Sequence, residues 1–171
     1  MGDPEHFKPY YAGLWAKHRD DTQELKKELE TTHPKLLNTM KLGYGADTAD
    51  YKEYSPTEKA EPSITIHKEF HEVSCIWITG SDAVTPSLTS DMWLRPDKLL
   101  KAKIKTDQKI KCWFYFKYPK ARYVLELEDV LPYEKNTIEP NLKGVNEKFI
   151  AIPVSKGKHV NLLHDWFKNN Y

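Results

Sequence analysis

The run from Lys111 to Tyr118, KCWFYFKY, limits the fold of this chain more than any other feature. Five aromatic rings in eight residues are typical of a β-strand. Because successive side chains of a strand point to opposite faces, the run has one mixed face and one apolar face. The mixed face holds Lys111, Trp113, Tyr115 and Lys117, and the apolar face holds Cys112, Phe114, Phe116 and Tyr118. The apolar face therefore belongs in a core, and the mixed face is either a ligand surface or a second buried face.

Other segments carry weaker signals of secondary structure. Alternating apolar and polar residues predict strands at Ile64–His67, Val73–Ile78 and Phe149–Val154, and a half-exposed strand at Leu99–Lys105. Two segments are ambiguous. The pattern of Thr85–Leu94 suggests a short helix, and that of Ala121–Leu131 fits a strand and a helix equally well.

The N-terminal part is predicted to be helical. Pro9 suits the first position of one helix, Asp21 with Glu24 resembles the start of a second, and Pro34 opens a short third helix that ends at Gly43. The last segment, Val160–Asn169, reads as a closing helix with an apolar side. We therefore expect an α+β fold with a mainly antiparallel sheet or a small β-barrel, a helical N-terminal layer and a C-terminal helix.

Three regions divide the chain of 171 residues. Residues 1–43 form the helical segment, 44–63 an acidic stretch expected to be a flexible linker or loop, and 64–171 a β-rich domain. The two cysteines, Cys75 and Cys112, lie far apart in strand-like runs, which predicts buried thiols in a reducing compartment. No run is long and apolar enough for a membrane helix. We expect a cytoplasmic or nuclear protein that does not associate with membranes.

The net charge of +1 conceals an asymmetry. Residues 1–94 hold 10 Lys or Arg and 16 Asp or Glu, whereas residues 95–171 hold 16 and 9. Such a division indicates either a basic binding face or two halves that attract each other.

Signatures of enzymes are mostly missing from the sequence. It has no Gly-rich phosphate loop, no nucleophile elbow and no Cys-x-x-Cys. His67 and His71 do not fit a zinc-binding helix, and on a strand they would lie about 13 Å apart. His159 and His164 are candidate acid–base groups, but sequence names no neighbour that would tune them. We therefore predict no catalytic residues, no metal and no cofactor.

A basic and aromatic region is the stronger candidate for a site. Only Asp97 and Asp107 oppose its positive charge. Cations neutralise phosphates, and exposed rings stack on bases at ~1–3 kcal/mol each. Its ten basic residues are Arg95, Lys98, Lys101, Lys103, Lys105, Lys109, Lys111, Lys117, Lys120 and Arg122.

Two short runs resemble the motifs of an RNA recognition motif. Ile76–Ser81 is similar to the six-residue motif, and Lys111–Tyr118 resembles the eight-residue one, with a basic first residue and aromatic residues at the third, fifth and eighth places. In that family the two strands lie side by side at the sheet centre, and their rings stack on bases. The resemblance implies a platform of Trp77, Trp113 and Tyr115, with Lys111 contacting the backbone.

A second architecture fits the same stretch. Lys109–Phe116 and Arg122–Asp129 can form a hairpin across Tyr118–Ala121, followed by a strand at Lys148–Val154. This order is similar to the small β-barrels of the PUA-like group, including the EVE and YTH domains, which bind modified bases in aromatic cages. The resemblance implies a cage drawn from Trp77, Trp93 and Trp113. Ala121–Leu131 discriminates between the two architectures, as a helix in the first and a strand in the second.

The leading hypothesis is a non-enzymatic nucleic-acid-binding module, with RNA preferred to DNA. Its expected contacts are Trp77, Trp113, Tyr115, Lys111, Lys117, Lys103, Lys105 and Arg122. A protein–protein interaction or scaffold domain is the alternative, and an enzyme with a dispersed site is the third hypothesis.

Overall fold

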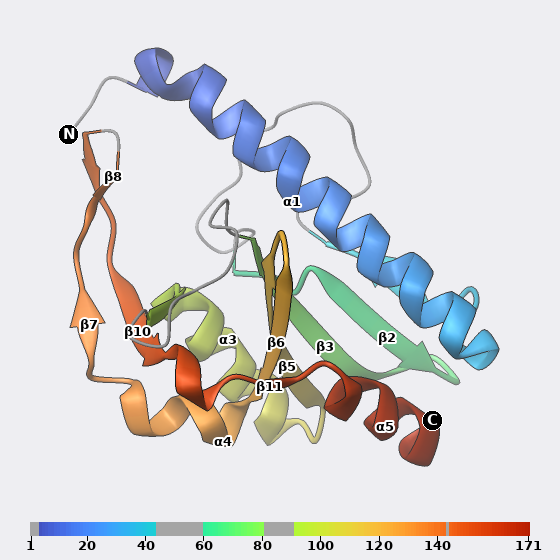
Figure 1. The fold of residues 1–171 in the computed structure, drawn as a ribbon. Helices are drawn as coiled ribbons and strands as arrows, with labels where there is room; N and C mark the ends of the chain where they lie inside the picture. Colours follow the sequence, from blue (N-terminus) through green and yellow to red (C-terminus); the bar gives the residue numbers. More distant parts are fainter. Residues whose placement is uncertain (1–3, 44–59, 81–90, 143) are drawn as a thin grey trace.

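The computed structural model describes residues 4–43, 60–80, 91–142 and 144–171 (Figure 1). Its largest element is a six-stranded sheet in the order β1-β2-β3-β5-β6-β11. The strands are β1 (Met40–Leu42), β2 (Ile64–Lys68), β3 (His71–Gly80), β5 (Lys111–Tyr118), β6 (Ala121–Glu126) and β11 (Lys158–His159). The strands predicted at Ile64–His67, Val73–Ile78 and Lys111–Tyr118 are thus confirmed.

The central pair of the sheet, β3 and β5, is parallel, and every other pair in it is antiparallel. A parallel pair needs a long crossover, and the helix α3 (Pro96–Asp107) belongs to it. The prediction of a strand at Leu99–Lys105 is therefore wrong. Pro96 suits the first turn of a helix, and Leu99 with Ala102, three positions apart, forms the buried side of α3.

A smaller sheet lies beside the large one, in the order β4-β10-β7. It contains β4 (Asp91–Leu94), β10 (Phe149–Pro153) and β7 (Thr137–Ile138). The strand predicted at Phe149–Val154 is confirmed, whereas the end of the segment for which a short helix was suggested, Asp91–Leu94, is a strand. Because β10 does not join the β5–β6 hairpin, the PUA-like strand order is not formed.

Short elements connect these sheets. Ala121–Leu131 is neither one strand nor one helix, because β6 ends at Glu126 and α4 begins at Leu127. A capping box between Glu126 and Asp129 marks that change. The connecting elements are α4 (Leu127–Val130), the 3-10 helices η1 (Pro34–Leu36), η2 (Leu131–Tyr133) and η3 (Val154–Lys156), and the hairpin of β8 (Asn141–Leu142) and β9 (Val145–Asn146).

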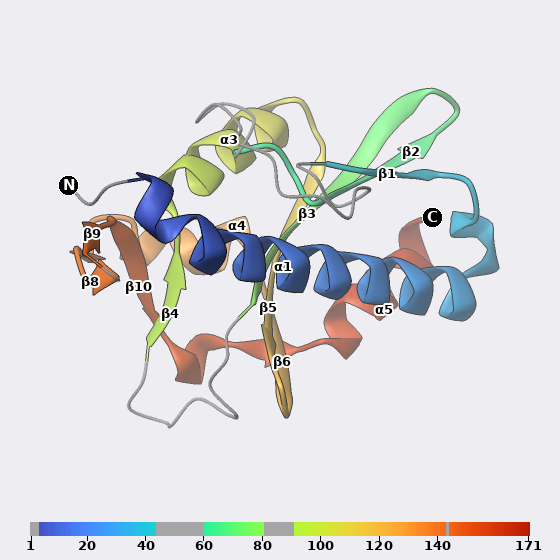
Figure 2. The same ribbon diagram turned by 90° about the horizontal axis from the view of Figure 1, so that it is seen from above.

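Two long helices cover one face of the large sheet. They are α1 (Pro4–Thr32) and α5 (Asn161–Asn170), and α3 lies on the opposite face (Figure 2). On the first face Leu25, Leu29, Leu163 and Phe167 of the helices pack against the sheet. The mixed α+β arrangement, with its mostly antiparallel sheet and its N- and C-terminal helices, is as expected from the sequence.

The N-terminal region differs from its prediction. One continuous helix replaces the two expected before Thr32, so Asp21 lies inside α1 and pairs with Lys17 at 2.7 Å instead of starting a helix. A 3-10 helix begins at Pro34 as expected, but it ends at Leu36, and β1 follows it before Gly43. Most of the acidic segment, 44–59, lies outside the described residues, and its end from Ala60 to Ser63 is largely buried.

Both cysteines are buried thiols, as expected, and burial raises the pKa of Cys75 to about 12. Among the helices that the structure describes, none is both long and apolar enough to cross a membrane.

Candidate functional site

The three rings expected to form a stacking platform are all buried. Trp77, Trp113 and Tyr115 are 0%, 1% and 2% exposed. They also lie on opposite faces of the sheet, because Trp77 pairs in register with Phe114 rather than with Trp113. The predicted alternation of β5 is correct, but helices cover its mixed face. These rings therefore cannot stack on bases in this conformation, and Trp77 and Trp113 cannot share a cage.

The mixed face of β5 is closed by α5 and by polar contacts. The ring of Trp166 on α5 meets that of Trp113 edge-on at 6.3 Å, and the Trp113 Nε1 has no hydrogen-bond partner among the described residues. The hydroxyl of Tyr115 accepts a hydrogen bond from Arg122 at 3.3 Å. Burial raises the pKa of Tyr115 to about 12, although Arg122 opposes that shift. Tyr115 is thus a buried neutral phenol.

Most of the basic residues expected to bind phosphates are paired with carboxylates. Lys111 pairs with Glu126, Lys103 with Glu134, and Lys105 with Glu72 at 2.7 Å. Four pairs join the basic half of the chain to the acidic half, which favours the interpretation that the two halves attract each other. They are Lys101–Glu61, Lys105–Glu72, Lys117–Glu24 and Arg122–Glu28.

One open groove of about 570 Å³ collects basic and aromatic side chains. It lies at the turn between β5 and β6, and β11 with the start of α5 forms its other wall. Two of the residues predicted from sequence, Lys117 and Arg122, line it, whereas Lys103, Lys105 and Lys111 do not. Its polar and aromatic lining is Lys117, Tyr118, Lys120, Arg122, Tyr123 and His159.

The cations of this groove differ in how firmly they are held. Lys120 is exposed and makes no ion pair with any described residue. Lys117 pairs at 2.8 Å with Glu24, whose side chain is 62% exposed, and such a surface pair contributes only about 0–1 kcal/mol. A ligand phosphate can therefore replace Glu24. Arg122 is fixed more firmly, because Glu28 and the Tyr115 hydroxyl both contact its guanidinium.

Gly157 allows the wall formed by β11 and the start of α5 to lie against the wall formed by the β5–β6 turn. A Cβ at position 157 would lie 2.7 Å from the ring of Tyr123, so a larger residue would push the wall away. Beyond it, the backbone N–H of Asn161 donates to His159 Nδ1 at 3.1 Å. The Nε2 of a neutral His159 therefore carries the proton and can donate to a ligand. The start of α5 adds partial positive charge to the same wall.

A chain of polar side chains joins the groove to the middle of α5. Glu28 contacts Arg122 through one carboxylate oxygen and His164 Nε2, at 2.8 Å, through the other. Partial burial opposes ionisation of Glu28, but the hydrogen bonds from His164 and Arg122 outweigh it and hold its pKa below the usual value. Sequence reasoning considered His164 but missed Glu28 and His33, because no local pattern places them beside it.

The histidines do not gather into a metal site. His159 and His164 lie at the groove and on α5, while His67 and His71 lie on the β2–β3 hairpin. Among the residues that the structure describes, no group of three or more His, Cys, Asp or Glu side chains could hold a metal ion. Models of known protein families do not match this chain, and neither does any curated protein sequence.

Proposed function

We propose that this protein is a nucleic-acid-binding module that holds a single strand in the groove between the β5–β6 turn and the start of α5. The observation that carries the proposal is the convergence of Lys117, Lys120, Arg122 and His159 with two tyrosine rings in one open groove. Cations track a phosphate backbone, and a partly exposed ring offers a base a stacking surface. The half-buried ring of Tyr123 takes the role predicted for the buried tryptophans, and the ring of Tyr118, which is itself buried, meets it edge-on at 6.1 Å.

The groove suits a single strand better than a duplex. No described helix projects from it to enter a major groove, and its walls are a strand turn and a helix end. Arg122, held by Glu28 and Tyr115, presents a preorganised guanidinium to a phosphate. Lys117 and Lys120 extend the positive charge along the turn.

Fluorescence anisotropy with labelled RNA and DNA 12-mers of the same sequence tests the proposal. Wild-type binding should weaken as salt rises, and Lys120→Gln should reduce the slope of log K against log salt by about 0.7, the value for one contact to a single strand. The control is Lys135→Gln, because Lys135 is exposed and does not line the groove.

Two results would overturn this assignment. One is an absence of salt-sensitive binding to either 12-mer at low ionic strength. The other is an equal loss of affinity in Lys120→Gln and Lys135→Gln, which would show only a general attraction to positive charge. Preference for RNA over DNA would appear as tighter binding of the RNA 12-mer.

One observation favours a protein contact as a second function. Phe70, at the tip of the β2–β3 hairpin, is fully exposed, and its φ of 69° is rare for a large side chain. An aromatic residue held outward in this way can anchor a second protein molecule. If copies of this chain associate through it, sedimentation velocity should show concentration-dependent association that Phe70→Ser abolishes.

A further inference from the structure

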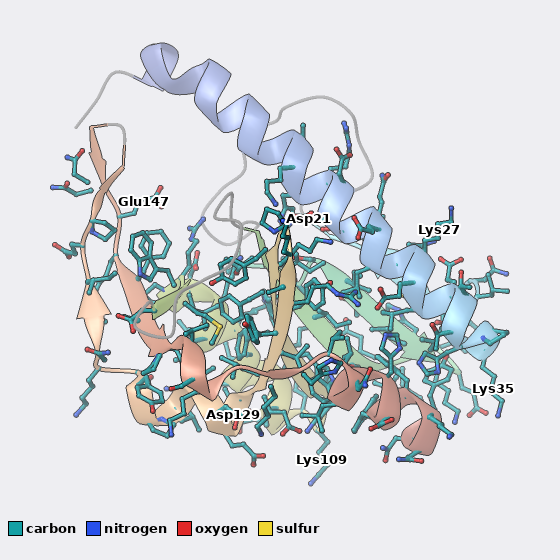
Figure 3. The ribbon with its side chains drawn as sticks, in the orientation of Figure 1. Asp21, Lys27, Lys35, Lys109, Asp129 and Glu147 are labelled. Carbon is teal, nitrogen blue, oxygen red and sulfur yellow. The ribbon has the colours of Figure 1, made fainter. Side chains whose placement is uncertain are left out.

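Two histidine rings connect the end of α1 to α5. His33, which follows α1 directly, places its Nε2 3.0 Å from Nδ1 of His164 on α5. The opposite nitrogen of His164 lies 2.8 Å from Glu28, and Glu28 also holds Arg122 in the groove. Figures 1 and 2 both show the end of α1 close to α5, and Figure 3 labels Lys35 at this end of the molecule.

The chain of hydrogen bonds can hold one added proton without breaking. Because the carboxylate of Glu28 only accepts, His164 donates from Nε2, and its Nδ1 then accepts from Nε2 of His33. A first added proton can sit on His164 beside Glu28, provided that the proton of His33 moves from Nε2 to Nδ1. His164 then donates to His33, so the contact between the rings remains.

A second added proton cannot be accommodated in the same way. Both rings would then be cations, with one N–H group facing another across 3.0 Å. Burial, and then the charge of His164, already lower the pKa of His33. The other charged or titratable groups described near His33 mostly add positive charge, and the carboxylate of Glu28 opposes it. They are Lys35, Lys168 and Tyr171, which line a cavity of about 200 Å³ with His33, and Arg122 and Tyr115 beyond Glu28.

We propose that the His33–His164 pair is an acid-sensitive latch: doubly protonated, it separates, loosens α5 from α1 and disturbs the α5 wall of the groove. The start of α5, at Val160 and Asn161, lines that groove. The middle of α5 carries His164, so both sites lie on one rigid helix. The effect on binding rests on the function proposed above, whereas the loosening of α5 does not.

The direction of the pH effect follows from the lowered pKa of His33. A histidine that favours its neutral form in the fold stabilises the folded contact above its unfolded pKa of 6.5, and this contribution is lost as the pH falls through the folded value. Between pH 6.5 and the lower folded value, each pH unit should reduce the ratio of closed to open molecules by up to about tenfold.

Hydrogen exchange of the α5 amides, followed by NMR from pH 7.5 to pH 5, tests the latch without any ligand. After correction for intrinsic exchange, protection of α5 should fall below pH 6.5 in the wild type. It should persist in His33→Gln, whose amide can still donate to His164. His71→Gln is the matched control, because His71 is exposed on the far hairpin and should behave as the wild type. Equal protection profiles for the wild type and His33→Gln would overturn the latch.

Binding of the RNA 12-mer over the same pH range tests the connection to the groove. Wild-type affinity should fall as the pH drops below 6.5, whereas His33→Gln should keep its affinity, because its latch cannot become doubly protonated. If α5 loosens in acid while the wild type and His33→Gln show the same trend in RNA affinity, the proposed connection between the latch and the groove is wrong. If α5 loosens and neither protein binds the RNA at any pH, the proposed function fails and the latch itself stands.

Discussion

The two faces of the six-stranded sheet are packed by different kinds of side chain. Under α3, β4 and β10 the residues are mainly apolar, and the indole N–H of Trp77 is satisfied by the Ala60 carbonyl at 2.9 Å. Under α1 and α5, Trp113 Nε1 has no hydrogen-bond partner in the described part of the chain, and a polar chain runs from Tyr115 through Arg122 and Glu28 to the histidines.

This difference assigns stability mainly to the face under α3 and ligand binding to the face under α1 and α5. An unpaired buried polar group costs about 1–3 kcal/mol, and a half-buried charge is tolerated only where partners satisfy it. The core cluster under α3 mostly avoids these costs. The face under α1 and α5 accepts them, and the groove that we assign to ligand binding lies at its border. Variants on each side can confirm or contradict this division.

The largest effect is expected from removing bulk on the apolar face. Trp77→Ala should lower the free energy of unfolding by about 3–5 kcal/mol, because a large cavity opens among buried neighbours. Urea denaturation measures the change. The fraction of the variant that remains folded should bind RNA as the wild type does. A loss of RNA binding under conditions where the variant is fully folded would contradict the division between the two faces.

Replacing each tryptophan by phenylalanine compares the two faces directly. Trp77→Phe leaves the Ala60 carbonyl without its donor, whereas Trp113→Phe removes an N–H that had no partner. The first substitution should therefore be more destabilising than the second by about 1–2 kcal/mol. Equal losses in chemical denaturation would show that the indole N–H groups do not distinguish the faces.

Glu28→Gln should weaken the polar face by about 1–2 kcal/mol at pH 7.5, because it removes the charge that His164 and Arg122 share. Since the fold lowers the pKa of Glu28, its contribution is present above its ordinary value of 4.5 and is lost as the pH falls through the folded value. The difference in stability between wild type and variant should accordingly shrink in acid. A difference that stays constant from pH 7.5 to well below pH 4.5 would argue against an ionised Glu28.

The smallest effect is expected at the surface of α3. Lys103 pairs with Glu134, but both side chains are more than a third exposed. Lys103→Gln should change stability by only about 0–1 kcal/mol and leave RNA affinity unchanged. A clear loss of affinity would restore Lys103 to the binding surface that the sequence predicted.

Local patterns predicted the strands well and their surroundings poorly. The alternation in Lys111–Tyr118 placed each side chain on the correct face, because period two is a property of the strand alone. Whether a helix covers that face depends on distant residues such as Trp166, so exposure of Trp113 could not be read from the strand. The prediction of a strand at Leu99–Lys105 was wrong for a different reason. Lysines that alternate with apolar residues over a few positions also fit a partly exposed helix, and Pro96, which suits the first turn of a helix, was the better indicator.

The candidate site was predicted only in part. Lys117 and Arg122 were predicted from the density of basic residues, and the turn between their strands was predicted across Tyr118–Ala121. The remaining wall, from Gly157 to Asn161, is brought there by the pairing of β11 with β6. That pairing involves only two residues of β11, too few to leave a periodic signal in the sequence.

The brevity of the edge strands also bears on how the protein behaves when concentrated. The two strands at the margins of the large sheet, β1 and β11, have three and two residues. A long, flat margin offers unpaired backbone groups to neighbouring molecules and seeds fibrils, whereas margins this short leave little to template. The aromatic-rich strand KCWFYFKY, the segment most prone to amyloid if exposed, is shielded between β3 and β6. Aggregation should therefore follow global unfolding rather than growth from the native edge.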